Sequence, residues 1–150
     1  MSVPEIVLDT NVLVAGLRSR RGASARLLAL VGTGRFNINL SVPLVLEYEG
    51  VLLRPELRMP VSPGAIAAVL DYHCSVGRCH EIFFLWRPCL KDPGDDMVLE
   101  VAVKAGCQYI VTHNERDFAG CERFGVQAVT PGTFLRHIGG YDEHAEPSAS

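Results

Sequence analysis

Acidic residues stand at points of the chain where the expected elements would bring them to one end of a sheet. Asp9 directly follows the apolar run Ile6–Leu8, Glu47 lies inside a helical period, and Asp95 and Asp96 open another helical period. Carboxylates held close together repel one another, and each pair about 4 Å apart costs about 4 kcal/mol at an effective dielectric constant of about 20. A divalent cation offsets that repulsion, and an all-oxygen ligand set suits Mg²⁺ or Mn²⁺. Such a site can activate water and polarise a phosphate, which is the chemistry of phosphodiester hydrolysis.

Each of these carboxylates also has a structural interpretation. Asp9 would suit a helix cap or a turn, and Asp95 and Asp96 would suit the first turn of a helix, where the helix dipole favours acids. Asp95 lies at the edge of the apolar stripe of that helix, whereas Asp96 lies about 100° further round. Asp95 is therefore the better placed of the two to point inward, and Asp92 before them reads as a turn residue.

Glu47 is the acid whose position is hardest to explain structurally. It is expected on one helix face with Leu44, Tyr48, Val51 and Leu52, whereas Glu49 points nearly opposite. Removing a charged glutamate from water onto a buried helix face costs about several kcal/mol of folding free energy unless its charge is compensated. An arginine partner, a raised pKa or a bound cation would each compensate it.

A polar cluster follows the expected strand Gln108–Thr112. Thr112 and Asn114 can hydrogen-bond a ligand, a water or a neighbouring carboxylate, and Asp117 suits a supporting acid or a helix cap. His113 is a weak candidate for a general base, because a lone histidine in a loop is more often merely solvated.

Short apolar runs alternate with helical periods along the chain, which favours an α/β domain with a mainly parallel central sheet. In such sheets, sites form beyond the carboxyl ends of the strands. The expected strands are Ile6–Leu8, Phe36–Leu40, Glu81–Leu85, Gln108–Thr112 and Val126–Val129. The expected helices are Ala23–Val31, Ser41–Leu53, Ser62–Cys74, Asp95–Ala105 and a short one opened by Thr130. We expect a single domain over residues 1–138 and a disordered tail over residues 139–150.

Composition excludes several classes of protein. The chain has 150 residues, 48% of them hydrophobic, and a net charge of −3, so net charge alone would not drive it onto nucleic acid. Its longest apolar runs fall far short of the ~20 residues of a membrane span. The first residues lack the basic and apolar regions of a signal peptide. Five cysteines, an odd number, read as reduced thiols, and Cys74, Cys79, His80 and Cys89 lack the spacing of a structural zinc site. We therefore expect a soluble cytoplasmic protein.

Four segments in order resemble PIN-domain nucleases, and the likeness extends over about residues 5–138. They are Ile6–Leu13, Leu46–Tyr48, Asp92–Ala102 and Tyr109–Phe118. The subgroup that the chain most resembles comprises toxin components of bacterial toxin–antitoxin pairs. The resemblance implies a Rossmann-like three-layer sandwich, and an acidic site for Mg²⁺- or Mn²⁺-dependent cleavage of single-stranded RNA. It also implies a small protein antitoxin and a homodimer as partners.

The family's acids carry over to Asp9, Glu47 and Asp95, with Asp96 a possible further metal ligand. Asn11 matches an amide that steadies the first aspartate, and Thr112 matches a small hydroxyl residue. The family often has a fourth acid where this chain has Asn114, which puts a second metal ion in doubt and leaves Asp117 or Asp96 as substitutes.

Basic side chains must contact RNA phosphates if this interpretation holds. Arg18, Arg20 and Arg21 are expected in a loop shortly after Asp9, and Arg116 lies near the cluster after the fourth strand. We predict that these four arginines contact RNA; the alternative is that Arg18, Arg20 and Arg21 belong to an ordinary solvated loop.

Two other functions fit part of the pattern. A phosphatase with Asp9 as nucleophile would need a second aspartate where Asn11 stands, and its distal lysine would have to be Lys91 or Lys104. A binding module would keep the fold while Asn114 impairs the site. Metal-dependent hydrolysis of RNA accounts for more of the acids than either alternative.

Overall fold

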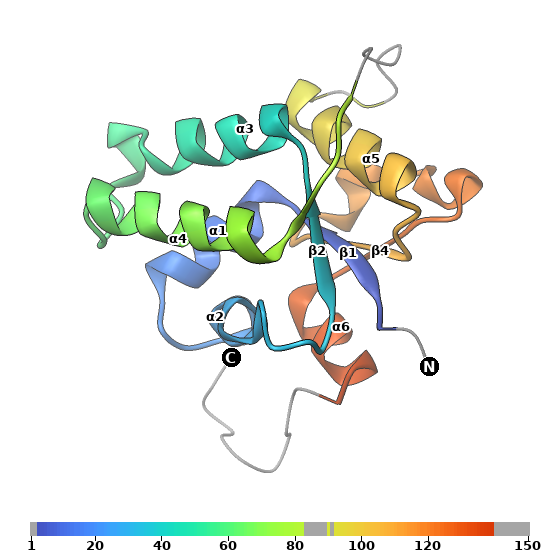
Figure 1. Ribbon diagram of the computed structural model, residues 1–150, viewed down its shortest axis with the longest axis horizontal. Coiled ribbons are helices and arrows are strands. Elements are labelled where there is room, and N and C mark those ends of the chain that lie inside the picture. The colour runs from blue at the N-terminus through green and yellow to red at the C-terminus, as the bar shows by residue number, and fades with distance from the viewer. Residues whose placement is uncertain (1–2, 83–89, 91, 140–150) are drawn as a thin grey trace.

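A parallel sheet of five strands forms the centre of the domain. The computed structural model describes residues 3–82, 90 and 92–139. The strands lie in the order β3-β2-β1-β4-β5, which places β1 between β2 and β4 (Figure 1). Ile6 in β1 is in register with Ile38 on one side and with Tyr109 on the other. The strands are β1 (Glu5–Leu8), β2 (Asn37–Leu40), β3 (Arg78–Cys79), β4 (Tyr109–Val111) and β5 (Gln127–Val129).

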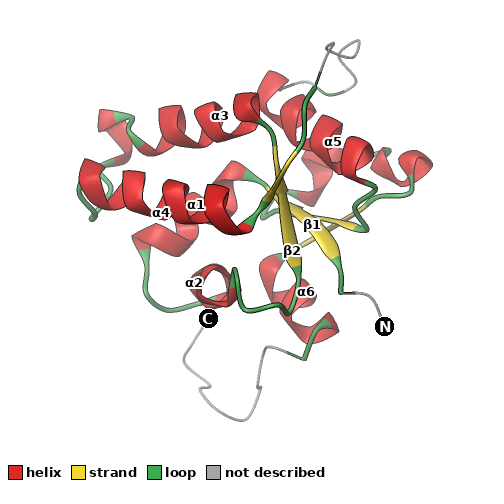
Figure 2. Cartoon of the chain, in the orientation of Figure 1, coloured by secondary structure: helices red, strands yellow, loops and turns green. Residues whose placement is uncertain are grey.

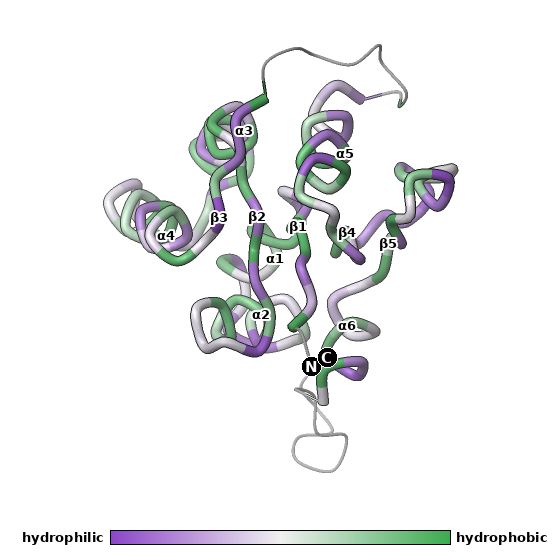
Figure 3. The backbone as a smooth tube through the Cα atoms, turned by 45° about the vertical axis from the view of Figure 1, so that its right-hand side comes forward, coloured by the Kyte–Doolittle hydropathy of each residue, from purple (hydrophilic) through white to green (hydrophobic). Residues whose placement is uncertain are grey.

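Helices cover both faces of this sheet (Figure 2). The α-helices are α1 (Thr10–Arg18), α2 (Ala23–Leu30), α3 (Val42–Leu52), α4 (Pro63–Val76), α5 (Pro93–Ala105) and α6 (Pro131–His137). Short 3₁₀ helices are η1 (Pro55–Leu57), η2 (Glu115–Phe118) and η3 (Cys121–Phe124). Figure 3 shows α5 on one side of the row of strands and α2 and α6 on the other. The α5 helix contacts β1, β2 and β4, and α6 packs on α2. The domain is thus a three-layer, Rossmann-like α/β sandwich.

The core lies between these layers. The two central strands, β1 and β4, are short but mainly apolar on both faces, as is usual for buried parallel strands. Ile6, Val7 and Ile110 are fully buried. The Phe134 ring of α6 meets Phe36 at 5.4 Å and Tyr109 at 5.6 Å between ring centroids, both in edge-on geometry. Phe134 therefore packs at the amino ends of β2 and β4, away from the carboxyl ends that the polar clusters follow.

Three helices begin with the same local device, a capping side chain followed by Pro and Gly. Ser62 caps α4, Asp92 caps α5 and Thr130 caps α6, and each side chain accepts a hydrogen bond from a backbone N–H of its helix. Proline suits the first helical position because that N–H would lack a partner anyway. The α5 helix ends at Gly106, whose φ of 67° is a conformation that glycine adopts at little cost.

Most of the expected elements are present, with two corrections. Residues 10–18 form α1, so Arg18 ends a helix and does not lie in a loop. The third described strand is Arg78–Cys79, paired with Asn39 and Leu40, and Glu81 and Ile82, the described part of the expected third strand, are not in a strand. Residues 83–85 of that expected strand, Lys91 and the tail from residue 140 lie outside the described residues. In the described ranges, no helix has the length and apolar character needed to cross a membrane.

Candidate functional site

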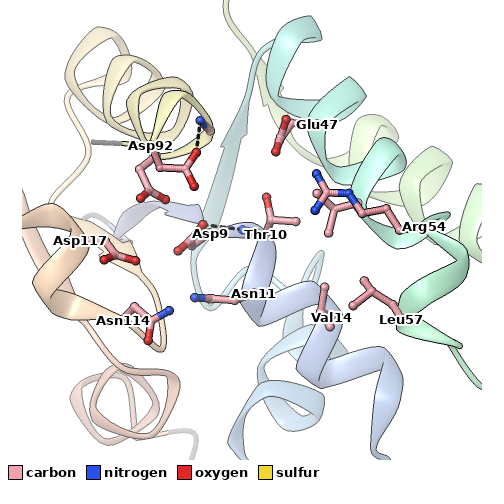
Figure 4. Close-up of a pocket in the computed structure, with 13 residues that line it drawn as sticks. Asp9, Thr10, Asn11, Val14, Glu47, Arg54, Leu57, Asp92, Asn114 and Asp117 are labelled. Carbon is pink, nitrogen blue, oxygen red and sulfur yellow. Dashed lines mark hydrogen bonds between the residues drawn. The ribbon is translucent and has the colours of Figure 1, made fainter. Parts of the chain in front are cut away.

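The site lies where the strand order reverses. The chain passes from β1 outward to β2 and β3, then crosses back to β4 on the other side of β1. Ligand sites of open α/β sheets form beyond the strand ends at such a point. A pocket of about 330 Å³ opens there. Its described lining comprises Asp9, Thr10, Asn11, Val14, Glu47, Val51, Arg54, Leu57, Asp92, Gly94, Asp95, Asn114 and Asp117 (Figure 4).

Asp9 follows β1 and is both the cap of α1 and the centre of the pocket. One carboxylate oxygen accepts a hydrogen bond from the Thr10 N–H at 2.8 Å, and the other accepts one from the Thr112 hydroxyl at 2.8 Å. Burial raises the pKa of Asp9, these two hydrogen bonds lower it, and Asp117 and Asp92 raise it further. The helix-cap interpretation and the functional one are therefore compatible, because capping orients the carboxylate toward the pocket.

Thr112 and Asn11 connect the ends of β1 and β4. The fully buried Thr112 hydroxyl donates to Asp9 and accepts from the Asn114 N–H at 3.0 Å. The Asn11 amide donates to the same hydroxyl at 3.5 Å, and its carbonyl oxygen accepts from the His113 N–H at 3.3 Å. Thr112 thus contacts Asp9 directly and Asn11 contacts it only through the Thr112 hydroxyl, and the supporting role of both residues stays a prediction.

Glu47 comes from α3, which Tyr48 anchors to the sheet. The Tyr48 hydroxyl donates to the Leu8 carbonyl at the end of β1, and Tyr48 is buried with Leu44 and Leu52. Glu47 is only half-buried and faces the pocket from the edge of this stripe. It forms no ion pair with the Lys and Arg side chains that the structure describes. An arginine partner therefore does not compensate its charge.

Glu47 also lies against the first turn of α5. A Cβ atom at Gly94 would lie 3.0 Å from a Glu47 carboxylate oxygen and 3.3 Å from an Asp92 carboxylate oxygen. The corresponding glycines of α4 and α6 have more room, since their nearest neighbours would lie at 3.8 and 4.0 Å. Gly94 thus lets α3 and α5 bring two carboxylates together.

Asp95 has the most perturbed carboxyl of the pocket. Burial and then the charges of Asp9, Asp92, Asp117 and Asp96 raise its pKa to about 7. Asp92 caps α5 through the Gly94 N–H at 2.8 Å, as the turn interpretation predicts, but it lines the pocket as well. A carboxyl whose pKa is raised by burial and by neighbouring carboxylates in a pocket is a recognised mark of a functional site.

The structure brings together most of the residues expected in the site. Asp9, Asn11, Glu47, Asp95, Asn114 and Asp117 line the pocket, and Thr112 lies directly behind Asp9. Asp117 therefore supplies a carboxylate close to Asn114. Asp96 does not line the pocket, and its carboxylate accepts a hydrogen bond from the Leu90 N–H at 3.1 Å.

The arginines expected to contact RNA lie elsewhere. Arg18 donates to the Leu57 carbonyl at 2.7 Å, and Arg20 lines a separate groove beside α4. Arg21 and Arg116 are exposed and do not line the acidic pocket. The His113 ring is directed to Ser24 in α2, at 2.7 Å, which removes it as a base for this pocket.

Four lining residues were not expected from the sequence: Val14, Val51, Arg54 and Leu57. Val14, Arg54 and Leu57 form the wall that faces Asp9 and Asp117 (Figure 4). These residues come from α1, from the last turn of α3 and from η1, and nothing in their local sequence pattern indicates a site. The hydrogen bond from Arg18 to the Leu57 carbonyl holds η1 at the pocket.

The donor set fits a hard divalent cation. The pocket offers carboxylate, amide and hydroxyl oxygens, and the pKa values of Asp9 and Asp95 are raised first by burial and then by the neighbouring aspartates. Among the described residues, no three His, Cys, Asp or Glu side chains already lie close enough to surround one ion. Mg²⁺ usually keeps several waters and takes one or two carboxylates directly, so the arrangement remains suitable.

Comparison with known proteins identifies the family. A family model described as PIN domain matches residues 5–116, and the chain therefore belongs to the PIN-domain family. PIN domains are generally nucleases and typically bind divalent metals such as Mg²⁺ or Mn²⁺. A search of curated proteins finds no match to this chain.

Proposed function

We propose that this protein is a divalent-metal-dependent endoribonuclease that hydrolyses single-stranded RNA. The observation that carries the proposal is the pocket at the strand-order reversal, where Asp9, Glu47 and Asp95 converge from three elements with Asp92 and Asp117 beside them. A bound Mg²⁺ or Mn²⁺ would supply charge neutralisation, polarisation of the phosphate and activation of the attacking water.

Each residue of the candidate site has a defined role in this proposal. Asp9 and Asp95 would hold the cation, and the Thr112 and Thr10 hydrogen bonds fix the Asp9 carboxylate in one orientation. Glu47 faces the pocket from α3, where its carboxylate would help to orient the attacking water. Asp117 adds charge from the β4 side, which compensates for the neutral Asn114.

Three substitutions test these tasks. Asp9→Asn, Glu47→Gln and Asp95→Asn should each lower cleavage of a labelled single-stranded RNA by at least about 100-fold, because each removes a charge that contacts the cation or its water. Circular dichroism should show an unchanged fold. Asp71→Asn, on the exposed face of α4, is the matched control and should cleave normally. Native activity in all three site variants would overturn the assignment.

We also propose a biological role, because four segments of the chain resemble those of PIN-domain toxins. The protein would act in the cytoplasm as the toxin of a toxin–antitoxin pair, as a homodimer silenced by a small protein antitoxin. Expression of the native chain should then arrest growth, and Asp9→Asn should relieve the arrest. Growth that is equally slow with both chains would argue against a toxin.

A catalytically impaired binding module is the second candidate. Asn114 at a position where the family often has an acid favours it, as does the open spacing of the acids. It predicts Mn²⁺ binding by calorimetry without hydrolysis. Of the two lysines that the phosphatase alternative could use, Lys104 lies nine residues along α5 from Asp95, about 14 Å at 1.5 Å per residue, which is too far to serve the pocket. Lys91 lies outside the described residues.

A further inference from the structure

Arg54 is the one cationic side chain among the described residues that line the acidic pocket. It follows the last turn of α3, and its guanidinium points into the pocket from the wall opposite Asp9 and Asp117 (Figure 4). Its side chain is exposed and forms no ion pair with any described carboxylate, Glu47 included. A guanidinium that stays unpaired beside several carboxylates is free to bind an anion that enters the pocket.

The surroundings of Arg54 are apolar. Val14, Val51 and Leu57 are half-buried and line the pocket together with it. Asp9, Asp92 and Asp117 lie across the pocket from Arg54, whereas Glu47 extends from α3 on the Arg54 side (Figure 4). The pocket therefore has an acidic half and a half that combines one positive charge with aliphatic surface. At about 330 Å³ it lies at the small end of ligand pockets, which span about 300–1,000 Å³, and it suits a single nucleotide unit.

For electrostatic reasons, the two halves of the pocket would bind different parts of one RNA strand. A phosphate can approach the carboxylates only with a cation between them, because like charges repel. The neighbouring phosphate of the same strand needs a positive partner of its own. Arg54 offers a planar fork of N–H donors that matches phosphate oxygens.

We propose that Arg54 and the Val14–Val51–Leu57 wall form a nucleotide subsite that binds the phosphate next to the scissile one and packs against its ribose or base. This inference rests on the proposed ribonuclease function and specifies how the substrate strand lies in the pocket. Arg18 supports the subsite indirectly, since its hydrogen bond to the Leu57 carbonyl holds η1 in place.

The salt dependence of binding separates this role from a structural one. Each phosphate contact to a single strand contributes about 0.7 to the slope of log K against log salt concentration. Binding of a fluorescent RNA of about eight nucleotides, within the usual range of single-strand site sizes, is measured by anisotropy with Ca²⁺ in place of Mg²⁺. A gel after each titration verifies that the RNA is intact.

Arg54→Gln should weaken binding several-fold at low salt and reduce the slope by about 0.7, and Arg54→Lys should restore the slope. Arg58→Gln is the matched control, because Arg58 is exposed in the same loop but does not line the pocket. Leu57→Ser should weaken binding without changing the slope.

The outcomes distinguish the subsite from the proposed function. A native slope in Arg54→Gln, or an equal loss of slope in Arg58→Gln, would overturn the subsite and leave the ribonuclease proposal standing. A native protein that fails to bind the RNA at all would overturn both.

Discussion

Replacing Asp95 with Asn should stabilise the metal-free protein while it destroys the site. The pKa of Asp95 is raised from 3.8 to about 7, first by burial and then by neighbouring aspartates. The unfolded chain binds fewer protons at this group than the folded chain between about pH 4 and pH 7, so folding stability falls as pH rises through that window. Above pH 7 the folded protein carries the full cost of the charged carboxylate, and Asn removes that cost.

The size of the effect follows from the shift. A rise of about three pKa units corresponds to about 4 kcal/mol at the upper limit. Because solvent reaches much of the Asp95 carboxyl and screens it, we expect about 1–2 kcal/mol. For a domain of this size that is an increase in Tm of about 2–8 °C.

Urea denaturation in EDTA measures this change in the free energy of unfolding. It is carried out at about pH 8.5, above the window in which Asp95 titrates, and at about pH 4.5, near the lower end of that window. Asp95→Asn should gain about 1–2 kcal/mol at the higher pH and less than about 0.5 kcal/mol at the lower one. Asp71→Asn should change little at either pH. Equal gains at both pH values, or a loss of stability at high pH, would refute the reasoning about crowded carboxylates.

Two further substitutions probe the supports of the site. Gly94→Ala would place a Cβ 3.0 Å from a Glu47 oxygen, so kcat should fall about tenfold while Tm is unchanged or rises. Gly64→Ala, at the same helical position of α4, is the control and should leave kcat unchanged. Equal kinetics in both variants would contradict a positioning role for Gly94. Thr112→Val removes the donor to Asp9 and should cost about 1–3 kcal/mol in urea denaturation. The same change raises the Asp9 pKa, so the acid limb of the pH–rate profile should move to higher pH, and an unmoved limb would count against that hydrogen bond.

The sequence predicts the acidic half of the site well, because that half depends on local pattern. Asp9 ends an apolar strand, Asp95 opens an amphipathic helix, and the rule for strand ends places them together. The α1 helix could not be predicted from its own sequence, because four of its residues have low helix propensity: Thr10, Val12, Val14 and Gly16. Packing on α2 and α3 stabilises it instead.

The other half of the site could not be predicted from local pattern. Arg54 and Leu57 reach the pocket only because α3 ends beside α1 and because Arg18 holds η1 there. The strand Arg78–Cys79 could not be predicted for a similar reason. Arg78 and Cys79 are exposed and pair with the edge of β2, so the position of β2 and not their own hydrophobicity determines where the strand forms.

Cleavage of a labelled single-stranded RNA by the purified protein tests the central claim most directly. The native chain is assayed with Mn²⁺, with Mg²⁺ and with EDTA, beside Asp9→Asn prepared identically. We expect cleavage that requires metal and disappears in the variant, because Asp9 lies at the centre of the pocket. Cleavage that persists in EDTA or in Asp9→Asn would contradict it.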